Sequence, residues 1–238
     1  MGYSYPLHST DTSYCYHLAP IPVYKRVYDN DIITNRAYNF GLEILDAEQR
    51  LMGQELPGQY DNERQSNYEI NYDRKDEWVE NHELQPIGSR FYVKPNDFLD
   101  AENADVEIIK RRISNGFLEL LNSIGVKKLN NPVITESWLQ YYEPTEGRGH
   151  NAHNHNRWSH NEEKPLMFSG GYYLSDGEPI NDHPYSGVFA FHIRGSKHFI
   201  RPKAGMLLIW PHDIIHSVEP FYGKSHRAVI NFNIYNKV

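Results

Sequence analysis

Residues 227–235, near the end of the chain, read RAVINFNIY and alternate between two kinds of side chain. Because alternate residues of an extended strand point to opposite faces, one face of this segment is wholly apolar and the other is mostly polar. The apolar face carries Ala228, Ile230, Phe232 and Ile234, and the other face carries Arg227, Val229, Asn231, Asn233 and Tyr235. A strand on the surface of a sheet gives this alternation, and so does a barrel strand whose polar interior holds a polar ligand.

The same period of two is present from Pro132 onward. Short apolar or aromatic runs separated by Gly, Pro, Asn and Asp occur at 133–142, 167–174, 187–193, 205–210, 214–218 and 226–235. Short strands at this spacing are typical of an antiparallel sandwich or barrel. We therefore expect the second half of the chain to be a β structure.

The first 130 residues have helical and loop patterns instead. One apolar stripe at helical spacing consists of Tyr38, Leu42, Leu45 and Met52, which Gly53 can end. A second consists of Val106, Ile109, Ile113, Phe117, Leu120 and Ile124, with Gly125 at the position of a C-terminal cap. Residues 54–104 are polar and punctuated by Pro and Gly, which predicts a long loop region with one or two short strands.

The composition argues against several classes of protein. A chain of 238 residues that is 39% hydrophobic and 23% charged can form one sizeable core or two small ones. The net charge of −7 disfavours, without excluding, nucleic acid as a partner. A single cysteine, Cys15, rules out an intramolecular disulfide framework and a thiolate zinc cage. No apolar run is long enough to cross a bilayer, and residues 1–6 lack signal-peptide features, so we expect a cytoplasmic protein without a membrane partner.

Histidines are concentrated in one third of the chain. Ten of the 13 lie between His150 and His226, although surface exposure is the ordinary explanation for any one of them. His153 and His155 follow a strand that ends at Tyr142, and residues two apart on an extended chain offer both imidazoles to one metal ion. This pair alone is a weak signal, and a structural zinc site normally needs four ligands.

A third histidine strengthens the signal. His216 precedes Arg227 by 11 residues, so the two can lie on neighbouring strands of a barrel. Three histidines would leave open coordination positions on a metal, and a guanidinium fork binds a carboxylate through two hydrogen bonds.

The stretch from Trp138 to the C-terminus resembles the 2-oxoglutarate/Fe(II)-dependent oxygenases, and most closely a group of short oxygenases found in phages and marine bacteria. The motifs that carry the resemblance follow one another in order: His153-Asn154-His155, SGGYYL at 169–174, PKAGMLLIWP at 202–211, HSVEP at 216–220 and RAVINFN at 227–233. In addition, PIPVY at 20–24 is similar to the opening strand of this group.

The resemblance implies a mainly β fold with N-terminal helices (α+β), built on a double-stranded β-helix or jelly-roll barrel. We expect a single oxygenase domain, residues 1–238, in which 1–130 form a helical and loop buttress and 131–238 form the jelly-roll catalytic core.

By the same resemblance, His153 matches the first metal ligand and His216 the distal one, while Arg227 matches the residue that pairs with the far carboxylate of 2-oxoglutarate. The implied cofactors are Fe(II), 2-oxoglutarate as co-substrate and O₂. The wider superfamily has Asp or Glu as the middle ligand, whereas this chain has His155, as the closest group does. If His155 is not a ligand, an acidic residue completes the site, and the candidates are Asp213, Asp176 and Glu162.

Other residues are expected around this site. Trp138, Gln140 and Tyr142 share one face of their strand and form a wall for co-substrate or substrate. Asn231 and Asn233 lie on the same face as Arg227 and form the pocket floor. Arg157 and Trp158 belong to a loop at the entrance and contact substrate.

The predicted function is an Fe(II)- and 2-oxoglutarate-dependent dioxygenase, most simply a hydroxylase, in the host cytoplasm where the protein is phage-encoded. The predicted substrate is a small molecule or a peptidyl group. Two alternatives remain: a non-catalytic jelly-roll protein for binding or assembly, and a cupin-like metal dioxygenase with three histidines that does not use 2-oxoglutarate. The sequence does not specify the substrate or the oligomeric state.

Overall fold

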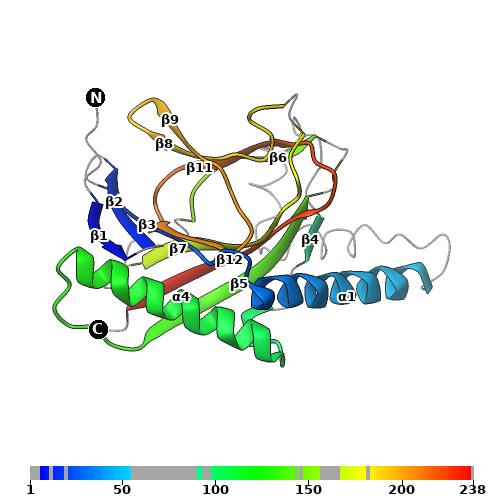
Figure 1. Cartoon of the computed structure of the whole chain (residues 1–238), viewed down its shortest axis with the longest axis horizontal. Coiled ribbons are helices and arrows are strands. Elements are labelled where there is room, and N and C mark those ends of the chain that lie inside the picture. Colours follow the sequence, from blue (N-terminus) through cyan, green and yellow to red (C-terminus); the bar gives the residue numbers. More distant parts are fainter. Residues whose placement is uncertain are drawn as a thin grey trace, which may run out of the picture.

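A large and a small antiparallel sheet face each other in the computed structural model, which describes residues 6–10, 13–18, 21–54, 90–92, 98–142, 144, 147–155, 167–180 and 183–236 (Figure 1). The large sheet, in its strand order, consists of β1 (Pro6–Thr10), β2 (Ser13–Leu18), β3 (Ile21–Val27), β10 (Met206–Pro211), β7 (Met167–Asp176), β12 (Arg227–Asn236), β5 (Pro132–Tyr142) and β4 (Arg90–Tyr92). The small sheet consists of β6 (Arg148–His153), β11 (His216–Phe221), β8 (Phe189–Ile193) and β9 (Ser196–Ile200). This is a jelly-roll fold, as predicted.

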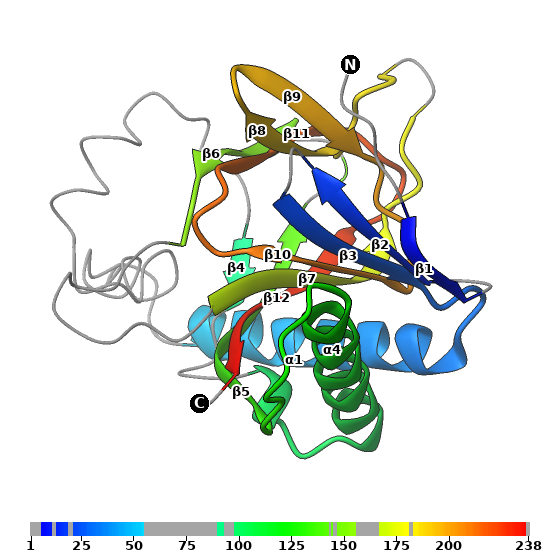
Figure 2. The same cartoon turned by 90° about the vertical axis from the view of Figure 1, so that its left-hand side faces the viewer.

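The helices in the described part of the chain lie on the outer face of the large sheet. Figure 2 shows α1 (Ile32–Gln54) and α4 (Ala104–Ser123) on one side of this sheet and the small sheet on the other. A short 3₁₀ helix, η1 (Phe98–Asp100), precedes α4. None of the helices in the described part of the chain has the length and apolar character needed to cross a bilayer.

The segment 227–235 lies at the centre of the large sheet as β12, paired with β5 on one side and β7 on the other. The four residues of its apolar face are buried in a cluster with the apolar stripe of α4. On the opposite face, Val229 belongs to a second cluster with residues of β8 from the small sheet. Arg227 on this face is only 1% exposed. The polar face of β12 is therefore directed into the barrel and not to solvent. Of the two explanations for its alternation, the barrel strand with a polar interior is correct, and the surface strand is not.

The helix predictions are confirmed in type and position. The stripe of α4 is buried from Val106 to Leu120, and the helix ends just before Gly125, whose φ of 82° is the left-handed conformation of a C-terminal cap. The first helix continues through Gly53 and ends at Gln54, so Gly53 is not its stop.

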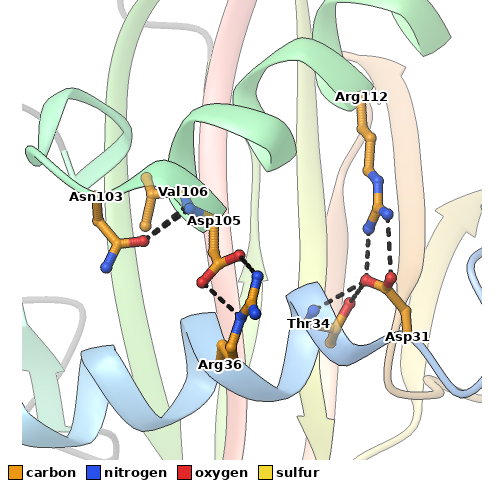
Figure 3. Close-up of polar contacts among 7 residues, drawn as sticks. All are labelled: Asp31, Thr34, Arg36, Asn103, Asp105, Val106 and Arg112. Carbon is orange, nitrogen blue, oxygen red and sulfur yellow. Dashed lines mark hydrogen bonds and ion pairs between the residues drawn. The ribbon is translucent and has the colours of Figure 1, made fainter.

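Polar clamps fix the two helices to each other (Figure 3). Asp31 caps α1 by accepting hydrogen bonds from Thr34 N at 2.9 Å and Thr34 Oγ1 at 2.8 Å. The same carboxylate accepts a two-pronged hydrogen bond from Arg112 of α4, at 2.6 and 3.1 Å. Arg36 of α1 forms a second fork with Asp105 in the first turn of α4, at 2.9 and 2.6 Å.

All six predicted β runs correspond to strands, but other strands were not expected. The N-terminal part was predicted as helix and loop, yet β1, β2 and β3 extend the large sheet, with β3 paired to β10. Of the predicted opening strand at 20–24, residues 21–24 lie in β3, and Pro20 lies outside the described residues. In the predicted loop region 54–104, the described residues include β4 and η1, and residues 55–89 and 93–97 lie outside the described part.

Candidate metal centre

Three histidines, two in neighbouring strands of the small sheet and one just beyond the first of these strands, converge. His153 ends β6, His216 begins β11, and the two residues are directly paired in the register of these strands. His155 lies two residues beyond β6. One ring nitrogen from each histidine lies within 4.8 Å of the others, and this cluster, found among the described residues, includes no carboxylate.

The Nδ1 atoms of His153 and His216 are bound to backbone carbonyls. His153 Nδ1 lies 2.7 Å from Asn151 O, and His216 Nδ1 lies 2.9 Å from Ile214 O. Because a carbonyl oxygen can only accept, each Nδ1 must carry the proton. In this tautomer the lone pair is on Nε2, which is the atom that can bind a metal ion.

His155 is held by side chains from the large sheet. Its Nδ1 lies 2.9 Å from Asn233 Oδ1 and 2.9 Å from Ser169 Oγ. Ser169 donates to the same Asn233 oxygen at 2.6 Å, and Asn233 Nδ2 donates to Glu136 Oε1. The ring of Trp138 lies 5.5 Å from that of His155.

The environment of His216 favours its neutral form. The side chain is 4% exposed, and the rings of Trp210 and Phe189 lie 5.0 and 5.5 Å away. Burial, together with the nearby rings of His153 and His155, lowers the pKa of His216 well below its ordinary value. A neutral imidazole is the form that coordinates metal ions.

Arg227 is a buried cation without a counter-ion among the described residues. All three of its guanidinium nitrogens lack a hydrogen-bond partner there. The guanidinium lies over the rings of Tyr142 at 4.4 Å and Tyr173 at 5.3 Å. Burial raises the pKa of Tyr142 and raises that of Tyr173 to about 12, so both phenols keep their protons and do not neutralise Arg227.

One pocket inside the barrel contains the three histidines and Arg227. The lining residues are Trp138, Gln140, Tyr142, His150, His153, His155, Tyr173, Phe189, Trp210, His216, Val218, Arg227, Val229 and Asn231. The buried Tyr142 hydroxyl and the Trp210 indole N–H also lack hydrogen-bond partners among the described residues. The pocket is therefore lined by donors suited to a bound anion.

The expected wall residues Trp138, Gln140 and Tyr142 line this pocket, as does Asn231, which donates to Gln140 Oε1 at 2.9 Å. Asn233 is on the expected face, but it lies behind His155 and is not among the lining residues.

The remaining candidates are outside the centre or outside the described residues. Asp213 is exposed, and Asp176 pairs with Arg227 only in the strand register, so neither belongs to the metal cluster. Arg157, Trp158 and Glu162 lie outside the described residues.

The sequence did not predict six of the lining residues, which are His150, Tyr173, Phe189, Trp210, Val218 and Val229. The ring of His150 lies 4.1 Å from that of His153, and its Nδ1 lies 3.3 Å from Gln140 Nε2. Residues three apart on a regular strand face opposite ways, but the β6–β11 register shifts between these two histidines, so both line the pocket. Trp210 has the apolar surroundings of a core residue and also borders the pocket.

Comparisons with known proteins bear on the fold. No protein-family model and no curated protein sequence matches the chain. Among solved structures, a prolyl-4-hydroxylase of Pseudomonas putida is similar with a TM-score of 0.55 and 16% identity, over 93% of this chain and 96% of that one. AviO1 of Streptomyces viridochromogenes Tue57 is similar with a TM-score of 0.56 and 12% identity, over 92% and 91% of the two chains. The resemblance to 2-oxoglutarate/Fe(II)-dependent oxygenases is thus confirmed as a likeness of fold, because this chain has the same jelly-roll fold as these two structures. The predicted closeness to oxygenases of phages and marine bacteria stays a prediction.

Proposed function

We propose that this protein is an Fe(II)- and 2-oxoglutarate-dependent dioxygenase, most simply a hydroxylase. The observation that carries the proposal is the combination, in one pocket, of three converging imidazoles and a buried guanidinium that lacks a partner among the described residues. The first feature suits a metal ion, and the second suits a carboxylate.

The donor set fits Fe(II). His153, His155 and His216 would hold the metal through Nε2, because each Nδ1 is engaged with an oxygen acceptor. Imidazole nitrogen is a suitable ligand for iron, and three protein ligands leave coordination positions open. When bound, the metal and its co-substrate supply the oxidising chemistry: O₂ is consumed, 2-oxoglutarate is decarboxylated to succinate, and a substrate is oxidised.

The rest of the pocket fits a dianionic oxo-acid. Arg227 offers a planar fork for one carboxylate, and the Tyr142 hydroxyl is a neutral donor near the guanidinium. Three neutral ligands would leave the metal charge uncompensated, so the site as a whole attracts a doubly negative molecule. This match favours 2-oxoglutarate over a mechanism without an oxo-acid, in which Arg227 would have no counter-ion.

The substrate class we propose is a small molecule or a peptidyl group. The side of the pocket near His150 is formed by Gln140 and Asn231, whose amides suit a polar, hydrogen-bonding substrate. The Pseudomonas putida protein is named for hydroxylation of prolyl groups, which makes a prolyl side chain the first substrate to try. The net charge of −7 argues against a nucleic acid.

The deciding experiment is anaerobic Fe(II) titration followed by O₂-dependent turnover of labelled 2-oxoglutarate. We expect tight metal binding and succinate formation, loss of metal binding in His216→Ala, and loss of turnover with retained metal binding in Arg227→Ala. Retained turnover in His155→Asp would identify position 155 as a ligand.

Two outcomes would favour the alternatives. Absence of tight metal binding, with normal behaviour of Arg227→Ala, would favour a non-catalytic jelly-roll protein. Metal-dependent O₂ consumption without succinate formation would favour the cupin-like dioxygenase that does not use 2-oxoglutarate. This alternative is considered because the cluster found among the described residues consists of three histidines and no carboxylate.

A further inference from the structure

We infer that Asn233 and Ser169 are positioning residues for His155, and that Glu136 orients Asn233, so that a hydrogen-bonded chain across the large sheet makes His155 a metal ligand. The inference rests on the proposed function, because it assumes that a metal ion binds the three histidines. It assigns roles to Ser169 and Glu136 and gives Asn233 a role other than contact with the co-substrate.

The three supporting residues form a row across the sheet. In the strand register, Asn233 of β12 lies opposite Ser169 of β7 on one side and opposite Glu136 of β5 on the other. Ser169 is fully buried and Asn233 is 4% exposed. The row is therefore held by the most extensively paired part of the large sheet, while His155 lies beyond the last residue of β6.

The directions of the hydrogen bonds follow from the carboxylate. Because an ionised Glu136 can only accept, the Asn233 amide must turn its NH₂ group toward it and its Oδ1 toward His155. The Oδ1 atom also only accepts, so His155 Nδ1 carries the proton and shares it between Asn233 and Ser169. Glu136 thus determines, through one amide, that the His155 lone pair is on Nε2.

His155 needs such support more than the other two histidines. His153 and His216 are paired residues of adjacent strands, and backbone carbonyls only two residues away hold their rings. The His155 backbone is bound to His212 O at 3.0 Å, but its ring depends on side chains from the opposite sheet. Groups that hydrogen-bond a ligating histidine typically change metal affinity about 10–100-fold when they are removed.

The test is Co(II) titration of the full-length protein, followed by the d–d absorption of the bound metal and by competition with a chelator. Asn233→Leu removes the acceptor while keeping a similar size, and we expect it to bind Co(II) about tenfold or more weakly, with an altered absorption spectrum. Ser169→Ala removes one of the two hydrogen-bond acceptors of His155 Nδ1, so we expect a smaller loss of Co(II) affinity than in Asn233→Leu. Glu136→Gln can still accept from Asn233 through its amide oxygen, and we expect it to bind like the wild type.

A double variant that exchanges the carboxylate and the amide, here called the polarity exchange, distinguishes loss of His155 positioning from loss of overall stability. In the double variant Asn233→Asp/Glu136→Gln, Asp accepts from His155, and the Gln amide donates to the other Asp oxygen. We expect wild-type or tighter Co(II) binding, because a carboxylate acceptor makes the imidazole a more basic ligand. Asn236→Leu is the matched control: Asn236 is also a buried amide of β12, but it bonds to Lys128 O and Asn130 N, remote from the histidines. We expect it to lower the melting temperature and leave Co(II) affinity unchanged.

Different results would overturn different statements. If the wild type binds Co(II) and Asn233→Leu and Ser169→Ala bind it equally well, the inference is overturned and the proposed function stands. If the polarity exchange folds and binds Co(II) about tenfold or more weakly than the wild type, the oriented chain is overturned, whether or not Asn233→Leu folds. If the wild type does not bind Co(II), both the inference and the proposed function are overturned.

Discussion

The buried guanidinium of Arg227 destabilises the folded state of the ligand-free protein. A charge removed from water without a counter-ion destabilises the folded state, and the contacts with the rings of Tyr142 and Tyr173 offset only part of that cost. A bound carboxylate would remove the penalty. Under the proposed function, Arg227 would therefore strengthen co-substrate binding and destabilise the fold.

This trade-off predicts opposite effects of one substitution. Arg227→Met keeps an unbranched side chain of similar length and removes the charge, so we expect the free energy of unfolding of the ligand-free protein to rise by on the order of 1 kcal/mol. Binding of 2-oxoglutarate to the metal-loaded protein should be lost. Urea unfolding and calorimetric titration measure the two effects, and Arg227→Lys, which keeps the charge but not the fork, should weaken binding without the gain in stability.

Gly170 lies so close to Phe232 and Leu208 that a side chain at this position would overlap them. A Cβ at this position would lie 2.2 Å from Phe232 Cζ and 2.7 Å from Leu208 O, whereas a Cβ at Gly171 would come no closer than 3.1 Å, to Val229 Cγ2. We expect Gly170→Ala to lower the free energy of unfolding by about 1–3 kcal/mol through overpacking, and Gly171→Ala to lower it less. Equal losses in urea unfolding would contradict this explanation.

At the scale of elements, the clamp between α1 and α4 predicts a pH dependence of stability. Partial burial raises the pKa of Asp31, but hydrogen bonds from Arg112 and Thr34 outweigh it and lower the pKa to about 2. Since the folded protein then holds fewer protons than the unfolded chain, the stabilisation is present above the ordinary pKa of 3.8 and is lost as the pH falls toward 2.

We therefore expect Asp31→Asn to be less stable than the wild type by about 1–2 kcal/mol at pH 7, with the difference shrinking between pH 4 and pH 2. Denaturant unfolding across this range measures it. Asp100→Asn is a suitable control, because Asp100 pairs with Lys110 at the surface, with 61% of its side chain exposed, and should have little effect at pH 7. A constant difference between Asp31→Asn and wild type would show that the carboxylate charge is not the cause.

Elements with a continuous apolar face were predictable from the sequence, and elements without one were not. The apolar stripe of α4 and the apolar face of β12 pack in the same buried cluster, so the apolar residues of both elements recur at a regular period. In contrast, β9 is almost wholly exposed and β6 has no apolar alternation, so neither strand has a pattern to read.

The same distinction applies to the site. The convergence of His153 and His216 was predicted from the resemblance, and it follows from the pairing of β6 with β11. The spacing of His216 to Arg227 suggested neighbouring strands, but β11 and β12 belong to different sheets, and the two residues line one pocket from opposite sides of the barrel. His150 enters the pocket through an irregular register, and Asn233 reaches His155 across 78 residues of sequence. Contacts between segments so far apart depend on the packing of one sheet on the other, and no local pattern encodes them.

At the scale of the whole molecule, the N-terminal and C-terminal parts share one core. A single buried cluster contains Ala37 of α1, Phe117 of α4, Tyr24 of β3, and Ile230 and Phe232 of β12. Neither part could lose these contacts without exposing the apolar face of the large sheet. From this sharing we propose that the chain is one domain with an N-terminal buttress, and not two independent units.

Because the two parts share one core, we predict that the whole chain unfolds in a single cooperative transition. Far-UV circular dichroism at 222 nm reports the helices, near-UV circular dichroism reports aromatic packing in the barrel, and we expect both to change at the same urea concentration. Because a fragment of residues 131–238 would expose the faces of Ile230 and Phe232 that α4 covers, we expect it not to fold alone. Loss of the helical signal at lower urea than the aromatic signal, or a folded fragment, would mean that the jelly roll is stable without the helices.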